Sequence, residues 1–216
     1  MKTIVDAVAG TPTAPSSVRD AEEAWRVHIA DSLAGLEFPG LRAARAIADV
    51  GAGAGFPGLP LAIALPQARV DLIESTSRKC DFMRRTIEAA GIVNARVVCT
   101  RSEEWAVDPP PDGGREAYHV VAVRAVGRLS TLAELASPLL RDGGVLLAWK
   151  GRRDPDEEAE FERASQRLAM EAEDVRWVGP YAGSRNRHLH LMRKRGATPT
   201  GLPRRPGMAK KRPFGS

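Results

Sequence analysis

The sequence predicts an α/β protein built on one seven-stranded, mostly parallel sheet with helices on both faces. Short apolar segments alternate with helical patterns along the chain, which is the order of elements in a parallel sheet with helical crossovers. The apolar segments are almost continuously hydrophobic, as expected of strands that are covered on both sides. With 216 residues, the chain fits one large domain of this kind better than two full domains.

The elements can be assigned in chain order. A helix is predicted from Ser17 to Leu36, because Ser17 and Asp20 form a capping box and an apolar stripe follows at helical spacing. Most of the first five strands are rich in Val, Ile or Leu: Ala46 to Val50, Val70 to Glu74, Ala95 to Cys99, His119 to Arg124 and Val145 to Trp149. The other elements are helices over Leu59 to Leu65, Lys79 to Ala90, Leu129 to Leu140 and Pro155 to Met170, and two last strands over Asp174 to Val178 and His188 to Met192.

Three regions are expected: a short disordered N-terminus over residues 1–16, one domain over residues 17–195, and a basic tail over residues 196–216. No apolar segment has the length of a membrane span, and Asp6 interrupts the first residues, which argues against a secretory signal. We expect a cytoplasmic monomer. Cys80 and Cys99 lack a CxxC spacing and a histidine cluster, so neither a disulfide framework nor a metal site is expected.

The charge is unevenly distributed. The formal net charge is +5, and residues 193–216 contain eight Lys or Arg and no Asp or Glu, which leaves the rest slightly acidic. A basic tail on such a body is typical of a protein that binds a polyanion. Because the tail is rich in proline and glycine, we do not expect it to pack when free. The alternative is that it only improves solubility.

The most informative segment is DVGAGAGFPG, residues 49–58, between the first strand and a helix. Glycines let the backbone approach a bound nucleoside, and a helix start offers free amide groups. The spacing of Gly53, Gly55 and Gly58 also fits the dinucleotide pattern G-x-G-x-x-G. Glu74 ends the second strand 21 residues after Gly53, where a carboxylate can accept hydrogen bonds from a ribose. NAD and S-adenosylmethionine both satisfy this pattern, and glycines that serve only a tight turn are the structural alternative.

Two features favour S-adenosylmethionine. The loop begins with Asp49, and a carboxylate attracts a sulfonium and an ammonium group, whereas it repels a pyrophosphate. The two strands after the fifth complete a methyltransferase sheet and are not needed in a nicotinamide domain. The sequence therefore predicts a methyltransferase.

Several motifs occur together in order, of which HIADSL (residues 28–33) and GAGFPGLP (residues 53–60) are the most specific. With them, the chain resembles the bacterial RsmG family, also called GidB, whose members methylate N7 of a guanine in small-subunit (16S) ribosomal RNA. The resemblance implies a Rossmann-like, seven-stranded, S-adenosylmethionine-dependent methyltransferase fold with a short N-terminal helix. The family usually has a longer helical segment before residue 17. The matching segments are residues 17–33, 49–60, 74–85, 101–104, 123–126, 150–151 and 203–213.

The resemblance also implies site residues. Glu74 would face the ribose, and Ser102 and Glu103 would lie beside the adenine. The full set expected to bind the cofactor is Gly51, Gly53, Phe56, Glu74, Ser102, Glu103 and Arg124. The candidates for positioning the substrate are His28, Asp31, Arg124 and Lys150. Plain structural alternatives are a packed helix residue for His28, an ordinary salt bridge for Arg124 and a solvated strand end for Lys150.

Methylation of guanine N7 needs positioning but no general base, because N7 carries an exposed lone pair. We therefore assign no catalytic base, and the sequence Val123 to Ala125 lacks the N-P-P-Y motif of amino methyltransferases. RNA is expected to be held by Arg185, Arg187, Arg193, Lys194, Arg204, Arg205, Lys210, Lys211 and Arg212, together with Arg78, Lys79, Arg84 and Arg85. The expected partner is 16S rRNA or the small ribosomal subunit. Two alternatives remain, a non-catalytic RNA-binding or ribosome-assembly factor and an NAD-dependent oxidoreductase.

Overall fold

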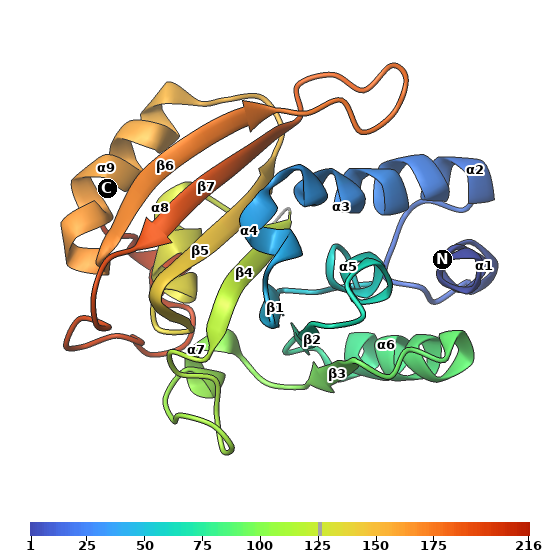
Figure 1. The fold of residues 1–216 in the computed structure, drawn as a ribbon, viewed down its shortest axis with the longest axis horizontal. Coiled ribbons are helices and arrows are strands. Elements are labelled where there is room, and N and C mark those ends of the chain that lie inside the picture. Colours follow the sequence, from blue (N-terminus) through green and yellow to red (C-terminus); the bar gives the residue numbers. More distant parts are fainter. Residues whose placement is uncertain (125–126) are drawn as a thin grey trace.

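A computed structural model describes residues 1–124 and 127–216. Its centre is a seven-stranded sheet with the strand order β3-β2-β1-β4-β5-β7-β6, in which β7 runs antiparallel to both neighbours and the other pairs are parallel (Figure 1). This confirms the predicted sheet. The strands are β1 Ala46–Val50, β2 Arg69–Ile73, β3 Ala95–Val98, β4 Tyr118–Arg124, β5 Leu140–Lys150, β6 Met170–Trp177 and β7 His188–Lys194.

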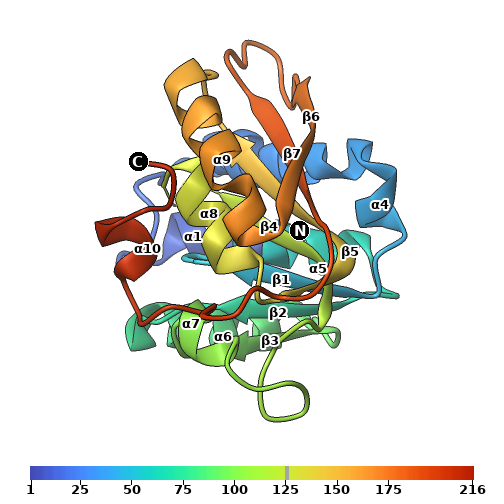
Figure 2. The same cartoon turned by 90° about the vertical axis from the view of Figure 1, so that its left-hand side faces the viewer.

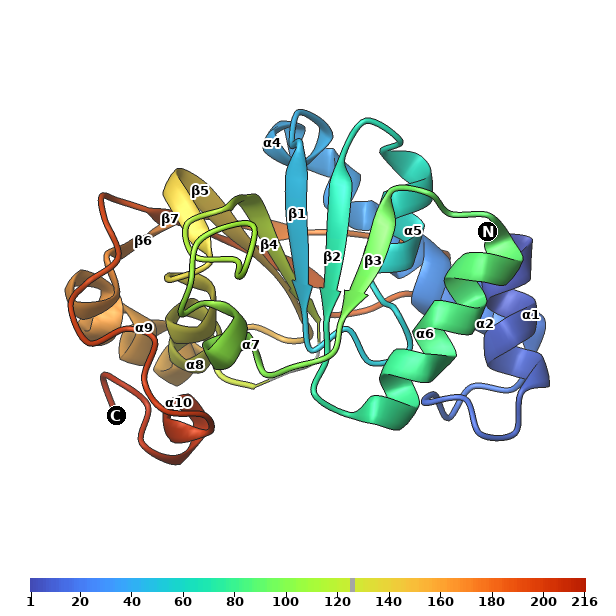
Figure 3. The ribbon, with the colours of Figure 1, turned by 90° about the horizontal axis from the view of Figure 1, so that it is seen from below.

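Helices cover both faces of the sheet (Figure 3). One core joins the sheet to α1, α5, α6 and the helical run from α2 to α4, and the other joins it to α7, α8 and α9. None of the helices in the described ranges has the length and apolar character needed to cross a membrane. The helices are α1 Lys2–Gly10, α2 Ala21–Ala24, η1 Trp25–Ala30, α3 Asp31–Leu33, η2 Ala34–Glu37, α4 Pro39–Arg42, α5 Gly58–Ala64, α6 Ser77–Ala90, α7 Ser102–Trp105, α8 Leu129–Ala136, α9 Pro155–Leu168 and α10 Met208–Lys211.

The N-terminus is helical, so the expectation of disorder over residues 1–16 is wrong. Helix α1 buries Ile4, Val5 and Val8 and packs against α2 and α6. A helix of nine residues is not stable alone. Its order therefore comes from a tertiary contact that the local sequence pattern does not reveal.

The next helical run starts later than expected. Asp20, not Ser17, caps it, because the Asp20 carboxylate accepts a hydrogen bond from the Glu23 amide at 2.7 Å. A π-helical turn, η1, interrupts the run, and Asp31 follows it in a buried position. The run from Ala21 to Glu37 is otherwise the predicted helix.

The basic tail is also ordered, contrary to expectation. Leu202 and Ala209 are buried, and α10 lies beside α8 (Figure 2). The Thr131 hydroxyl on α8 donates to the Ala209 carbonyl at 3.2 Å. Residues 202–213 are called the C-terminal arm below.

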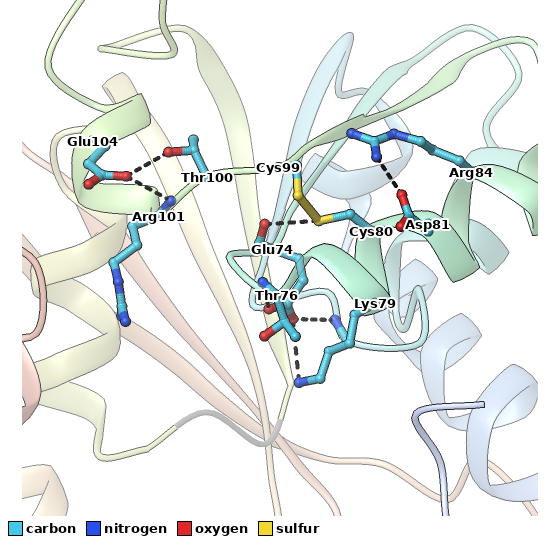
Figure 4. The surroundings of a disulfide bond; sticks show 11 residues. Glu74, Thr76, Lys79, Cys80, Asp81, Arg84, Cys99, Thr100, Arg101 and Glu104 are labelled. Atoms are coloured by element: carbon cyan, nitrogen blue, oxygen red, sulfur yellow. Dashed lines mark hydrogen bonds and ion pairs between the residues drawn. A yellow bond between two sulfur atoms is a disulfide. The ribbon is translucent and has the colours of Figure 1, made fainter. Parts of the chain in front are cut away.

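A disulfide joins Cys80 on α6 to Cys99, the residue after β3 (Figure 4). No disulfide was expected from the spacing of these cysteines, and the bond between them corrects that expectation. Their spacing of 19 residues carries no motif, but the crossover from α6 to β3 brings their Cα atoms to 5.9 Å, within the range that a disulfide spans.

The disulfide leads to a stability prediction. Because it closes a loop in the unfolded chain, Cys99→Ser should lower the free energy of unfolding by about 2–4 kcal/mol under oxidising conditions. With a reducing agent present, the variant and the wild type should be equally stable. Urea titrations in both conditions test this. A wild type whose free energy of unfolding is the same with and without the reducing agent would contradict the prediction.

Candidate active site

Three adjoining cavities lie along the carboxyl ends of β1, β2, β4 and β5, the edge to which the arrowheads in Figure 3 point. The central cavity, of about 1140 Å³, is lined by residues 51–54, 74–76 and 15–17 and by His28, Phe56, Lys79, Arg124, Gly127, Arg128, Thr131, Lys210 and Pro213. The small cavity, of about 200 Å³, lies at its β3 side and is lined by residues 50–51, 73–75 and 100–103 and by Thr131, Leu135, Gly207, Ala209 and Lys210. The side cavity, of about 380 Å³, lies at its β5 side and is lined by Val27, His28, Asp31, Arg124, Gly127, Trp149, Lys150, Gly151, Val178, Arg187 and His188.

The glycine loop forms the floor of the central cavity. Gly53 has φ +60°, a left-handed backbone that disfavours other residues, and a Cβ built there meets only the Gly51 carbonyl, at 3.7 Å. A side chain at this position would thus extend into open space. The loop therefore offers the kind of cradle in which a nucleoside can lie against bare backbone.

Glu74 lies where a ribose would be held, directly after β2. Its carboxylate accepts hydrogen bonds from the amides of Gly53 (3.2 Å) and Thr76 (2.9 Å), and Lys79 lies 3.6 Å away (Figure 4). Burial acts to raise the pKa of Glu74, but the two amides and Lys79 outweigh it, so the pKa is lowered. The ionised carboxylate keeps free lone pairs for two hydroxyl donors.

Ser102 and Glu103 lie at the start of α7 and line the small cavity. The Ser102 hydroxyl donates to Glu103 Oε2 at 3.2 Å, and the Gly207 amide of the C-terminal arm donates to Glu103 Oε1 at 2.8 Å. The sequence indicated Ser102 and Glu103 but did not indicate the contact of Glu103 with Gly207 of the arm. The arm is therefore part of the site that sequence reasoning missed.

Arg124, at the end of β4, separates the central cavity from the side cavity. Its guanidinium donates to the Val27 carbonyl and to Asp31 Oδ2, both at 3.1 Å, and contacts His28 Nδ1 at 3.2 Å. It also lies 5.3 Å from the centre of the Phe56 ring. Arg124 is thus a structural centre of the site as well as a wall. Residues 125–126 of the predicted motif lie outside the described residues.

His28 is neutral at physiological pH, because burial and the charge of Arg124 lower its pKa to about 4. Since arginine only donates, Nδ1 is the acceptor and Nε2 carries the proton, which it donates to the Ser16 hydroxyl at 2.9 Å. The ring stacks on Phe56 with centroids 4.5 Å apart. Arg124 therefore fixes the tautomer, and Ser16, which the sequence analysis missed, accepts the Nε2 proton. Only the position of Ser16 just before the family motif hints at this role.

The side cavity brings together the other predicted positioning residues. Lys150 donates to Glu157 at 2.6 Å and to the Gly127 carbonyl at 2.8 Å, so it is held rather than solvated. Asp31 Oδ1 and Arg187 Nε face each other at 3.6 Å, and neither takes part in a hydrogen bond within the described ranges. The cavity thus contains one acceptor, Asp31 Oδ1, and one donor, Arg187 Nε, that lie close together without a hydrogen bond between them.

Asp49 does not face the cofactor space, which corrects the argument made from its charge. The side chain is fully buried and lines none of the three cavities. Its Oδ2 accepts a hydrogen bond from the Gly58 amide at 2.7 Å, so it fastens the start of α5. The turn after β1 directs this carboxylate toward the helix, away from the ligand space.

The residues expected to bind RNA lie in three kinds of place: in ion pairs, in the side cavity and at the exposed surface. Lys194 is fully buried and paired with Glu116, Arg193 is paired with Glu173, and Arg204 is paired with the buried Glu134, so their charges are already compensated within the protein. Lys194 is therefore not available to a phosphate. Arg187 lines the side cavity, as described above. The exposed residues are Arg185, Arg205, Lys210, Lys211 and Arg212 near the C-terminus and Arg78, Arg84 and Arg85 on α6, whereas Lys79 is half-buried beside Glu74.

The fold and the site define a class. A seven-stranded sheet with an antiparallel β7, a glycine loop after β1 and an acidic residue after β2 are typical of S-adenosylmethionine-dependent methyltransferases. The chain matches the family model of rRNA small subunit methyltransferase G, GidB, over residues 9–189. It therefore belongs to this family, which decides between a methyltransferase and an NAD enzyme in favour of the methyltransferase.

Individual relatives agree with this assignment. Proteins named ribosomal RNA small subunit methyltransferase G include one from Rubrobacter xylanophilus, 41% identical over 91% of this chain and 75% of the relative, and one from Desulfitobacterium hafniense, 37% identical over 92% and 81%. Among solved structures, a predicted O-methyltransferase of Agrobacterium tumefaciens has a TM-score of 0.58 at 25% identity, covering 79% of this chain and 83% of that chain. A SAM-dependent methyltransferase from Aquifex aeolicus has a TM-score of 0.53 at 17% identity, covering 79% and 92%, and supports the fold.

Asp49 leads to a pH prediction. Burial raises the pKa of this carboxyl to about 7, although the Gly58 amide opposes the shift. Between about pH 4 and pH 7, the folded protein keeps a proton that the unfolded chain releases, so the contribution of Asp49 to stability falls as the pH rises through this window. Asp49→Asn keeps an oxygen for Gly58 and cannot ionise. The free energy of unfolding of Asp49→Asn minus that of the wild type should therefore increase by about 2 kcal/mol when the pH is raised from 5 to 8. Urea titrations at both pH values test this, and an unchanged difference would contradict it.

Proposed function

We propose that this chain transfers a methyl group from S-adenosylmethionine to N7 of a guanine in small-subunit (16S) ribosomal RNA. One observation carries the proposal: in a member of this family, the central cavity and the side cavity share Arg124, His28 and Gly127 as a common wall. A methyl donor held in the central cavity and a target base held in the side cavity would lie next to each other, on the two sides of these three residues. A ribosomal RNA substrate also implies a cytoplasmic protein.

The residues of the central and small cavities fit S-adenosylmethionine. Glu74 would hold the ribose, Ser102 and Glu103 would hold the adenine, and the bare backbone at Gly51 and Gly53 would lie against the nucleoside. The cofactor supplies an electrophilic methyl group on a sulfonium. Because His28 is neutral, it adds no positive charge beside a cationic donor.

The side cavity fits a guanine. The Watson–Crick edge of guanine presents the acceptor O6 next to the donor N1–H, whereas the same edge of adenine presents a donor next to an acceptor. Arg187 Nε and Asp31 Oδ1 provide the matching donor and acceptor for guanine once a base separates them. The Trp149 indole donates to the Asp31 carbonyl at 2.8 Å and fixes this part of the chain. Guanine N7, on the other edge of the base, needs no proton removed, so the protein has only to orient it.

The exposed cations of the arm and of the β6–β7 connection would contact RNA phosphates. Arg185 belongs to that connection, and Arg205 and Lys211 belong to the arm. Such contacts fix the register of the RNA without reading its sequence. Selection of the target base is therefore assigned to the side cavity.

The proposal predicts the product of the reaction. Small subunits and their naked RNA, taken from cells that lack this protein, should accept a labelled methyl group from S-adenosylmethionine, and digestion with mass spectrometry should recover it as 7-methylguanine. Label on another base or on protein would contradict the proposed target. Binding of S-adenosylhomocysteine and RNA without any transfer would favour a non-catalytic assembly factor.

Asp31→Asn should separate base recognition from cofactor binding. The change removes the charge shared by Arg124 and Arg187 and replaces one acceptor by a donor, so kcat/KM for RNA should fall by about tenfold to a hundredfold. The asparagine keeps one side-chain oxygen that can accept the hydrogen bond from Arg124, and position 31 does not line the central cavity, so the Kd of S-adenosylhomocysteine should stay within about twofold of the wild type.

Asp174→Asn is the matched control, because Asp174 is a half-exposed acid paired with Arg176 outside all three cavities. Its kcat/KM should equal that of the wild type. An equal loss in both variants, or a loss of cofactor binding in Asp31→Asn, would contradict the assignment of the side cavity to the base.

A further inference from the structure

The C-terminal arm is fastened to the body by one buried ion pair. Arg204 donates through Nε and Nη2 to the two carboxylate oxygens of Glu134 on α8, at 2.7 and 2.6 Å, and Glu134 is 4% exposed. A two-point contact with a buried carboxylate fixes both the position and the direction of the arginine. Arg204 also donates to the Arg212 carbonyl at 2.7 Å, and its guanidinium lies 4.0 Å from the centre of the Phe214 ring. The ion pair therefore joins both ends of the arm to α8, in addition to the hydrogen bond from Thr131 to the Ala209 carbonyl.

The fastened arm reaches the space assigned to the cofactor. The Gly207 amide donates to Glu103 Oε1 at 2.8 Å, and Ala209 and Lys210 line the small cavity across from Glu103 and Glu74. Lys210 also lines the central cavity. The arm enters this position through Gly207, whose φ of +82° other residues rarely adopt.

From these contacts we propose that the C-terminal arm forms one wall of the S-adenosylmethionine site, so that cofactor binding and docking of the arm stabilise each other. Glu103 is the residue assigned to the adenine, and the arm orients its carboxylate. Any group that binds better when the arm is docked must in turn favour the docked arm by the same factor. The inference rests on the cofactor of the proposed function but not on the identity of the methylated base.

Arg204 is a positioning residue in this proposal, and its neighbour supplies a matched control. Arg204→Ala and Arg205→Ala remove the same charge from adjacent positions, but Arg205 is exposed and has no ion pair within the described ranges. Without RNA present, isothermal titration with S-adenosylhomocysteine should show a Kd about tenfold weaker for Arg204→Ala and within about twofold of the wild type for Arg205→Ala. The loss of a basic residue from an RNA-binding tail would instead affect RNA binding in both variants and leave this Kd unchanged.

A measurement on the unaltered protein keeps the proposal testable if Arg204→Ala does not fold. Trypsin cleavage after Lys210 and Lys211, both exposed, reports undocking of the arm. Saturating S-adenosylhomocysteine should slow this cleavage about tenfold, and should leave cleavage after the exposed Arg152 unchanged.

The outcomes distinguish this inference from the proposed function. Unchanged cleavage in the presence of S-adenosylhomocysteine, or equal Kd values for the two variants and the wild type, would overturn the coupling even if 7-methylguanine is the product. Coupled binding in a protein that methylates another base would uphold the inference and overturn only the proposed target.

Discussion

The burial of one guanidinium at the end of β4 determines how the active site is built. The Arg124 side chain is 15% exposed, and its partners Val27, His28 and Asp31 all come from the helical run near the N-terminus. Removing a partner from a buried charge costs about 3–5 kcal/mol, so this run must dock across the ends of the strands. The hydrogen bond from Trp149 to the Asp31 carbonyl fastens the same run to β5. The wall between the two ligand spaces is thus a consequence of satisfying Arg124.

The strand order places the other ligand-binding groups around this wall. The sheet turns from β1 toward β2 on one side and toward β4 on the other, and a crevice opens where the direction of the connections reverses. Glu74 follows β2 and the glycine loop follows β1, so both face the crevice from one side while Arg124 faces it from the other. Groups separated by up to about a hundred positions meet because parallel strands present their carboxyl ends at one edge.

The same logic explains what the sequence could predict. Strands buried on both faces leave long apolar runs, and groups that follow such strands must lie at one edge, so the sheet and residues such as Glu74 and Arg124 were accessible to sequence reasoning. The misses depend on distant partners. Helix α1 is ordered by packing, Lys194 is buried by a pair with Glu116 at a separation of 78 residues, and the Cys80–Cys99 bond depends on how α6 crosses to β3. Asp49 shows a further limit, because composition does not tell which way a loop carboxylate points.

The ionisable side chains in and beside the cavities have fixed partners or are kept neutral by burial, and this limits the chemistry that the site can perform. Burial favours the protonated form of Asp49 and the neutral form of His28, while Glu74 has amide donors and Lys79, and Asp31 lies between two arginines. In the proposed reaction, S-adenosylmethionine would supply a methyl group from a sulfonium, and positive charge would pass from the donor to the base. Asp31 lines the cavity that the proposal assigns to the base, where it would face the Watson–Crick edge, so a negative charge would lie beside a base that becomes positive on methylation. Since no proton has to leave the base, the protein would contribute to the chemical step by aligning the donor and the base among these fixed charges and hydrogen bonds. None of these groups would have to change its protonation state during the transfer.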